Sequence, residues 1–200
     1  MRKILVTGFE PFDKSSLNPS KSIVRELEQD SSLVNLETLI LPVDFKSAAK
    51  LLIEKVDSAK PDVVICLGQA EGRSAITPER VAINIDDARI PDNAGNFPKN
   101  TEIISGGADG LFSTLPVYEI VEKLSRSDIP SSISYSAGTY VCNNVFYLIQ
   151  SHCKDKNIKS GFVHIPLMES QASEFPGLPT LSFETMLNAI KIIIAEVQRQ

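Results

Sequence analysis

The feature that most constrains this sequence is the alternation of short apolar runs with longer segments in which apolar residues recur at helical spacing. Short apolar runs that stop at glycine or at turn residues are typical of buried strands. Strands joined through helices pack side by side in parallel, with the helices covering the sheet. We therefore expect one α/β domain over residues 1–200 with a largely parallel sheet. The expected strands are residues 3–7, 36–43, 62–68, 81–85, 131–135 and 161–165, and the expected helices are residues 18–27, 44–56, 117–124, 142–153 and a last helix from about residue 182.

Local signals define two of the helix starts and one long irregular segment. Asn18 followed by Pro19 predicts a capped helix start, and Asp44 is the expected cap of the second helix. Residues 91–116 are rich in Gly, Asn, Asp and Pro, and residues 101–114 within them could form a hairpin. Long loops in compact domains are often functional. In α/β folds ligands gather at the carboxyl ends of the strands, here residues 8–9, 68–69 and 164–166.

The charge and the cysteine content exclude several classes of partner. A net charge of −5 and a pI near 5.1 argue against binding to nucleic acid or to an anionic membrane. No segment approaches the ~20 apolar residues that a membrane span requires. The three cysteines, Cys66, Cys142 and Cys153, show no metal-ligand spacing and cannot all pair with one another. We therefore expect no membrane or nucleic-acid partner and a reduced, cytoplasmic location.

Cys142 is the first candidate for chemistry. It follows a turn of small residues and opens a helical stripe that continues through Val145, Phe146 and Ile149 to Cys153. A thiol in the first turn of a helix is expected to have a lowered pKa, because the helix start favours an anion. The pattern alone leaves two interpretations open, a nucleophile or a small core residue, and favours the second. Cys66 and Cys153 are expected to lie in the core.

The two histidines differ in their expected environment. His164 ends an apolar strand just before Pro166, at the edge of the sheet where chemistry is expected. It is either the base that a thiol nucleophile needs or a core histidine with satisfied hydrogen bonds, and the pattern does not separate the two. His152 lies off the apolar stripe of its helix and is expected at the surface.

Glu79 is the candidate acid. It shares the parity of Val81, Ile83 and Ile85, the face that we expect to be buried, and a buried carboxylate requires a partner. The adjacent Arg80 is a poor partner, because neighbouring strand residues point to opposite faces. A further basic residue, at position 89, could bind an anion or hold one of the aspartates at positions 86 and 87.

Seven short motifs follow one another along essentially the whole chain. They are "TGFEPF" (7–12), "NPS" (18–20), "LPVDF" (41–45), "ITPERVAIN" (76–84), "DARIPDNAGNFP" (87–98), "SAGTYVCNN" (136–144) and "HIP" (164–166). With these motifs in this order the sequence resembles the pyroglutamyl peptidase family, also called the pyrrolidone carboxyl peptidases, which are cysteine exopeptidases.

This resemblance implies a fold, an activity and a catalytic set. The fold would be an open, twisted, mostly parallel sheet with helices on both faces, assembled as a homotetramer. Glu79, Cys142 and His164 would form the catalytic set, and N-terminally pyroglutamylated peptides would be the substrates. The pocket for the lactam ring would involve Phe9, Phe12, Gln69, Tyr140 and Val141. Arg89, together with backbone N–H near Cys142, would face the oxyanion.

Two positions depart from the pattern of the family. Glu71 stands where a glycine is expected, and Leu167 stands where an aromatic residue is expected. Neither is a member of the catalytic set, so pocket shape and specificity are what they affect.

The sequence therefore predicts a cysteine exopeptidase that removes N-terminal pyroglutamate through a thioester, without a metal or cofactor. Two alternatives stay open, another cysteine amidase or acyltransferase and a binding module without turnover. A nucleotide-binding function is disfavoured because the Gly-x-Gly-x-x-Gly fingerprint is missing. The broad apolar surface of the last helix, from Ile190 to Val197, leads us to expect a homo-oligomer. A lone exposed Ile192 is the alternative explanation.

Overall fold

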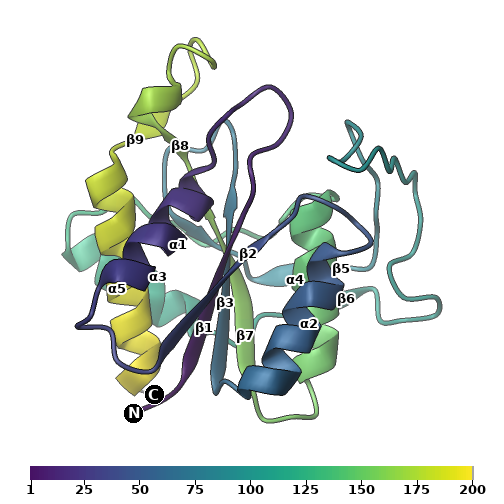
Figure 1. Cartoon of the computed structure of the whole chain (residues 1–200), viewed down its shortest axis with the longest axis horizontal. Coiled ribbons are helices and arrows are strands. Elements are labelled where there is room, and N and C mark those ends of the chain that lie inside the picture. The colour runs from purple at the N-terminus through teal and green to yellow at the C-terminus, as the bar shows by residue number, and fades with distance from the viewer. Residues whose placement is uncertain (200) are drawn as a thin grey trace.

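A five-stranded sheet lies at the centre of the computed structural model, which describes residues 1–199 (Figure 1). Its order is β2-β1-β3-β7-β4. The strands are β1 (Ile4–Phe9), β2 (Leu36–Leu41), β3 (Val63–Gln69), β7 (Lys159–Ile165) and the short β4 (Thr77–Pro78). The first four run parallel, and β4 pairs with β7 antiparallel at the edge. The expected mostly parallel sheet is confirmed.

Helices cover both faces of this sheet, as expected (Figure 1). One face carries α1 (Pro19–Gln29), α3 (Val117–Arg126) and α5 (Phe183–Arg199), and the other carries α2 (Ala48–Ala59) and α4 (Val141–Cys153). Alternating side chains of each strand enter the two layers. In β3, Ile65 and Leu67 pack with the first group of helices, whereas Val64 and Cys66 pack with the second.

Two small strand pairs outside the main sheet differ from the expectations. The fourth expected strand is only Val81–Ile83 (β5), and it pairs with β6 (Gly110–Phe112) outside the main sheet. The hairpin expected within residues 101–114 is therefore wrong, because the second β-prone run of that segment pairs with β5. β8 (Leu167–Met168) and β9 (Thr180–Leu181) form another small parallel pair around a 3₁₀ turn, Glu169–Gln171.

The strand expected at residues 131–135 is also wrong. This segment makes only isolated bridges, from Ser131 to Ile76 and from Ser134 to Glu79. The Ser134 hydroxyl bonds to the backbone of Ser136, donating to its carbonyl at 3.2 Å and accepting from its N–H at 3.3 Å. The segment stays hydrogen-bonded to residues 76–80, but Pro78 has no N–H to continue the ladder, so the two bridges remain isolated.

The two predicted helix caps have different outcomes. Asn18 accepts from the Ser20 N–H at 3.0 Å and Pro19 is the first helical residue, as expected. The second helix begins only at Ala48. Asp44 instead closes the turn before it, accepting from the Lys46 N–H at 2.8 Å and the Ser47 hydroxyl at 2.6 Å.

The broad apolar surface of α5 is explained within one chain. Ile190, Ile193, Ile194 and Val197 are all buried in the layer that α5 shares with α1 and α3, and only Ile192 is partly buried. This helix therefore does not support the expected oligomer, and the alternative explanation of a single less buried residue is the better one. Among residues 1–199, no helix has both the length and the apolar character needed to cross a membrane.

Candidate active site

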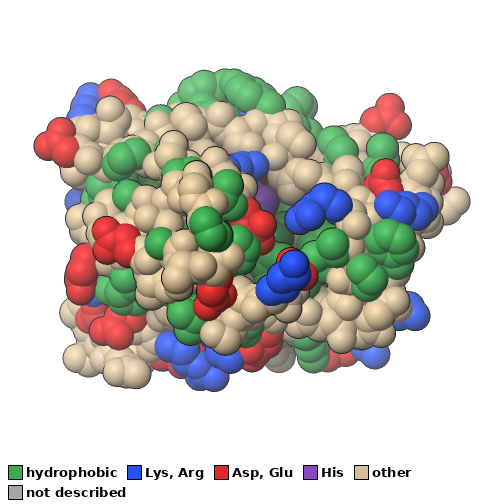
Figure 2. All heavy atoms as spheres, turned by 90° about the horizontal axis from the view of Figure 1, so that it is seen from above, with side chains coloured by type: hydrophobic (Ala, Val, Ile, Leu, Met, Phe, Trp, Pro, Cys, Tyr) green, Lys and Arg blue, Asp and Glu red, His purple; other side chains and the backbone are tan. Residues whose placement is uncertain are grey.

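A cavity of about 400 Å³ opens at the carboxyl ends of β1, β3 and β7, where the sheet topology places a ligand site. Figure 2 looks onto this end of the molecule and shows a histidine side chain within a hollow bordered by hydrophobic, basic and acidic side chains. All the candidate site residues except Glu79 line the cavity: Phe9, Phe12, Gln69, Arg89, Tyr140, Val141, Cys142 and His164. The structure thus brings together residues that are up to 155 positions apart, from 9 to 164.

Cys142 is the second residue of α4, and its thiol is directed at the sheet. A Cβ added to Gly68 would lie 3.0 Å from the Cys142 Sγ and 2.8 Å from the ring of Phe162. Glycine at position 68 therefore makes room for the thiol at the end of β3. In the parallel pairing of β3 with β7, Gly68 is opposite His164, whose side chain therefore leaves the sheet on the same face as the thiol.

The pKa of Cys142 is not lowered, contrary to the sequence expectation. Burial raises the pKa of the thiol to about 12, and the negative charge of Glu79 adds to this rise. The backbone N–H at the helix start and the charge of Arg73 act in the opposite direction and are outweighed. Cys142 is therefore a protonated thiol at rest, and attack by its sulfur would require a base that removes the proton.

His164 and Glu79 form a buried pair. His164 Nδ1 lies 2.7 Å from Glu79 Oε1, and both side chains are almost completely buried, at 4% and 0% exposure. Burial lowers the pKa of His164 and outweighs the attraction of Glu79. Burial alone would raise the pKa of Glu79, but the hydrogen bond and charge of His164, with the charge of Arg73, lower it. The pair is therefore a neutral imidazole beside an ionised carboxylate.

The sequence selected Glu79 for a reason that the structure contradicts. The buried face of the following segment consists of Ala82, Asn84 and Asp86, whereas Ile85 is exposed. The chain bends at Arg80 between β4 and β5, and this bend reverses the alternation. Glu79 is buried because it extends the β4 edge, where its N–H donates to the Phe162 carbonyl at 2.9 Å.

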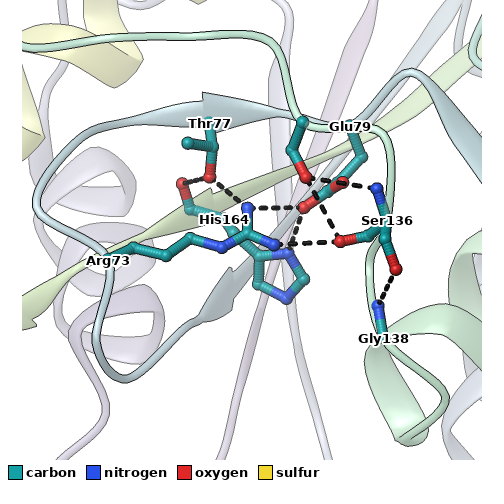
Figure 3. Close-up of polar contacts among 7 residues, drawn as sticks. Arg73, Thr77, Glu79, Ser136, Gly138 and His164 are labelled. Atoms are coloured by element: carbon teal, nitrogen blue, oxygen red, sulfur yellow. Dashed lines mark hydrogen bonds and ion pairs between the residues drawn. The ribbon is translucent and has the colours of Figure 1, made fainter.

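Sequence reasoning missed Arg73. Its guanidinium contacts Glu79 Oε1 at 2.7 Å and the Ser136 carbonyl at 3.0 Å, and it also contacts the Thr77 hydroxyl (Figure 3). The signal that could have found it is the need of a buried Glu79 for a cation. Arg80, adjacent to Glu79, instead donates to the Ser113 carbonyl and lies over the ring of Phe112.

Two asparagines after Cys142 anchor its helix, a role that sequence reasoning also missed. The Asn143 amide accepts from the Ile83 N–H at 3.0 Å and donates to the Ile83 carbonyl at 2.8 Å. Asn144 donates to Asp86 at 2.8 Å, and burial raises the pKa of Asp86 to about 6. The first turn of α4 is thereby fixed to the segment that follows Glu79.

Aromatic rings form one wall of the cavity. Phe9 is buried against Phe162, with ring centroids 6.2 Å apart, and Phe12 lies 6.2 Å from Tyr140. Tyr140 also packs against Phe45 in a T-shaped arrangement with ring centroids 5.3 Å apart, and its hydroxyl donates to a backbone carbonyl at position 91 at 3.0 Å. These contacts hold Tyr140 in place and leave apolar ring surface at the cavity.

Polar groups are distributed unevenly around the cavity. The Gln69 carbonyl oxygen accepts from Gln171 at 3.0 Å, so its NH₂ group is the end that remains for a ligand. Arg89 is exposed at the rim and is not joined to Asp86 or Asp87, which contact Asn144 and Lys99 instead.

The two residues that depart from the sequence pattern of the family lie in different places. Glu71 lines the cavity, whereas Leu167 is buried in β8 and is not among the lining residues.

The remaining candidates lie away from the cavity. Cys66 and Cys153 are buried, as expected, and all three cysteines are free thiols. His152, expected at the surface, is partly exposed and pairs with Asp57 at 2.9 Å. Residues 1–199 contain no group of three or more His, Cys, Asp or Glu side chains that could hold a metal ion.

Comparison with known proteins matches nearly the whole chain. A family model described as "Pyroglutamyl peptidase" matches residues 2–200. The pyrrolidone-carboxylate peptidase of Vibrio parahaemolyticus is 44% identical over 196 residues, covering 96% of this chain and 91% of that protein. The crystal structure of Bacillus amyloliquefaciens pyroglutamyl peptidase I has a TM-score of 0.95 and 37% identity, with coverage of 100% and 98%. That of pyrrolidone carboxyl peptidase from Pyrococcus furiosus has a TM-score of 0.92 and 39% identity, with 98% coverage of both chains.

Proposed function

The chain belongs to the pyroglutamyl peptidase family, and from this premise we propose that Cys142, His164 and Glu79 are the nucleophile, the base and the orienting acid of its active site. It is a cysteine peptidase that removes an N-terminal pyroglutamyl residue from peptides. The observation that carries the assignment of roles is the Nδ1–Oε1 contact of 2.7 Å between buried His164 and Glu79, because it leaves Nε2 for the thiol.

In the acylation step the Cys142 sulfur attacks the carbonyl carbon that joins pyroglutamate to the next residue. His164 Nε2 takes the thiol proton as the C–S bond forms, which the raised pKa of the thiol and the lowered pKa of His164 both require. Glu79 accepts from Nδ1–H, fixes the tautomer and stabilises the cationic imidazole. His164 then gives the proton to the leaving amine, and the C–N bond breaks.

In the second step water hydrolyses the thioester. His164 accepts a proton from the water as it attacks, and the sulfur leaves and regains its proton, which releases free pyroglutamate. The oxyanion of both steps is stabilised by the backbone N–H of Cys142 at the start of α4 and by Arg89 at the rim. No residue outside this set is required to move a proton.

The lactam ring of the substrate occupies the aromatic side of the cavity. Phe9 and Phe12 offer apolar faces to a flat, neutral ring, and the NH₂ group of Gln69 donates to the ring carbonyl. The N–H of the lactam donates to backbone near Tyr140 and Val141. An N-terminal proline would instead bring a charged amine into the same apolar surroundings, at a large cost in desolvation.

The assignment is tested with a fluorogenic pyroglutamyl amide and three matched cysteine variants. Cys142→Ser should abolish turnover without lowering the unfolding midpoint, whereas Cys66→Ser and Cys153→Ser should lose stability and keep turnover. Mass spectrometry of the quenched wild-type enzyme should find one pyroglutamyl group on Cys142. Equal losses of activity in all three variants, or bound ligand without acylation, would refute the assignment.

Cleavage of prolyl and glutaminyl amides tests whether the pocket is specific for the lactam ring. A buried site that is left with unpaired polar groups rejects an analogue by about 10⁴-fold or more. Both amides should therefore be cleaved at least ~10³-fold more slowly than the pyroglutamyl amide. Comparable rates on the prolyl amide would assign a broader amidase.

We also propose a homotetramer in the cytoplasm. A reduced compartment keeps the Cys142 thiol free for attack, which supports the location. Phe112, Tyr118 and Tyr135 are exposed by 59% or more and offer aromatic surface for contacts between copies. Sedimentation at micromolar concentration tests the assembly, and a monomer would contradict it. Fractionation of cells tests the location.

A further inference from the structure

We propose that Arg73 is a positioning residue of the active site, which holds Glu79 for His164 and fixes the loop that leads to Cys142. The inference rests on the proposed function, because it assigns a role relative to the catalytic set.

The geometry joins Arg73 to both parts of the His164 residue. Glu79 Oε1 lies 2.7 Å from Arg73 Nη1 and 2.7 Å from His164 Nδ1, so one oxygen serves both side chains (Figure 3). Arg73 Nη1 also contacts the Thr77 hydroxyl, which donates to the His164 carbonyl at 3.2 Å. Arg73 therefore supports the imidazole through Glu79 and the backbone of β7 through Thr77.

The same guanidinium reaches the segment before the nucleophile. Arg73 Nη2 donates to the Ser136 carbonyl at 3.0 Å, and the Ser136 hydroxyl accepts from the Gly138 N–H at 3.2 Å. Residues 136–138 line the cavity and lead into α4, where Cys142 is the second residue. A planar guanidinium can hold the acid and this loop at once, whereas a lysine offers a single point charge.

The permanent positive charge of Arg73 compensates the buried carboxylate of Glu79. Glu79 is fully buried, and its other partner, His164, is neutral at rest and charged only during turnover. Arg73 is 25% exposed, and its charge is permanent, so it compensates Glu79 in both states of His164. The carboxylate therefore stays ionised and keeps accepting from Nδ1–H.

Arg73 also acts on the base through its charge. The groups that bear on the charge of His164 are Glu79, which favours the imidazolium, and Arg73, which opposes it. The other groups along the cavity wall that can carry charge are Cys142, Glu71, Arg89 and Tyr140. Removing the positive charge at position 73 should therefore favour the imidazolium and raise the pKa of His164. A guanidinium with a merely structural role would leave this pKa unchanged.

The experiment compares Arg73→Gln, Arg73→Lys and the control Arg126→Gln, whose arginine pairs with Glu122 at the exposed surface of α3. Arg73→Gln should lower kcat by about 10- to 100-fold and move the acid limb of kcat/KM upward by about one pH unit. Arg73→Lys should keep the acid limb in place, because the positive charge remains. Its kcat should fall several-fold, because a lysine cannot contact Glu79 and the Ser136 carbonyl at the same time, as the planar guanidinium does. Arg126→Gln should match the wild type in both.

An NMR titration makes the inference independent of turnover. The chain has only two histidines, so His164 can be followed in ¹⁵N-histidine-labelled protein in a Cys142→Ser background. Adding Arg73→Gln should raise the His164 pKa, and His152 serves as the internal reference. If Arg73→Gln does not fold, a reduced kcat of Arg73→Lys at unchanged KM supports the inference, and an unchanged kcat overturns it.

The two proposals fail in different ways. If Cys142→Ser remains active, the proposed catalytic set is wrong, whatever Arg73 does to the His164 pKa. If Cys142→Ser is inactive while Arg73→Gln keeps the wild-type kcat, acid limb and His164 pKa, the catalytic set stands and the role of Arg73 is refuted.

Discussion

The molecule contains two groups of the same composition, each made of a histidine, a carboxylate and a basic side chain, and only one of them lies at the cavity. His164 lies 2.7 Å from Glu79, which also contacts Arg73. His152 lies 2.9 Å from Asp57, which also contacts Lys156 at 2.8 Å. The distances within the two groups hardly differ, so a short contact between histidine and carboxylate does not define a catalytic pair.

Burial and the choice of ring nitrogen separate the two groups. Glu79 is fully buried, whereas Asp57 is 51% exposed, so solvent screens the second group. Glu79 engages Nδ1 of its histidine and leaves Nε2 for the cavity. Asp57 and Lys156 both engage Nε2 of His152, which is therefore occupied by surface charges. The buried group lies where the proposed mechanism needs a proton carrier, and the exposed group ties α4 to α2.

The largest contrast is expected between the two histidines. His164→Ala should lower kcat by at least ~10³-fold, because the thiol with its raised pKa loses its base. His152→Ala should keep kcat within about twofold, as is usual for a surface substitution. Steady-state kinetics on the pyroglutamyl amide measure both. A greater loss in His152→Ala would reverse the comparison.

Substitution of Glu79 should also lower kcat more than substitution of Asp57, by a smaller factor than separates the two histidines. Glu79→Gln should lower kcat by about 10²- to 10⁴-fold, because the amide cannot stabilise the imidazolium and favours the wrong tautomer. Asp57→Asn should leave kcat unchanged. Activity in Glu79→Gln equal to that of Asp57→Asn would show that the buried pair has no part in proton transfer.

His164 in the buried group should also determine how kcat/KM changes at acid pH. Burial lowers the pKa of His164 below its ordinary value of 6.5 in the folded protein, so the midpoint of the acid limb of kcat/KM should lie below pH 6.5. The unfolded chain binds this proton more readily, so the contribution of His164 to the free energy of unfolding should fall as the pH drops below 6.5, whereas Asp86, whose pKa burial raises to about 6, acts in the opposite direction. Titrations of kcat/KM and of denaturant unfolding measure the two effects. An acid limb above pH 7 would contradict the lowered pKa.

Salt should have the smallest effect and act mainly on the exposed group. Raising NaCl from 0.05 to 0.5 M screens Asp57 and Lys156, whereas the buried pair is screened much less. We expect kcat to change by less than about twofold, since the catalytic pair is shielded from solvent. A steep fall of kcat with salt would mean that surface charges take part in turnover.

Repetitive patterns made most of the fold predictable from the sequence. The buried strands and the amphipathic helices around β1, β3 and β7 carry strong periodic signals, and the topology rule then located the cavity. The short strands β5 and β6 carry no such signal, because they pair with each other across the 26 residues 84–109. Pairing over such a distance leaves no local signature, so a hairpin within residues 101–114 was wrongly expected.

The site itself was predictable only in part. Cys142 and His164 could be selected by their positions at a helix start and a strand end. Glu79 was selected through an alternation that the bend at Arg80 reverses, and Arg73 carried no pattern at all. The pKa of Cys142 was expected to fall because a helix start is visible in the sequence, whereas the burial that raises it depends on the packed sheet.

The place of β7 in the sheet also governs when the enzyme becomes reactive during its own synthesis. β7 is the last strand of the central sheet along the chain, yet it inserts between β3 and β4. Glu79 and Cys142 precede His164 in the chain, so Cys142 lacks its proposed base until this insertion is complete. Such non-local pairings form late in folding, because loop closure must precede them. A half-folded chain therefore holds the Cys142 thiol without His164 beside it, and it should acquire its peptidase activity only as folding ends.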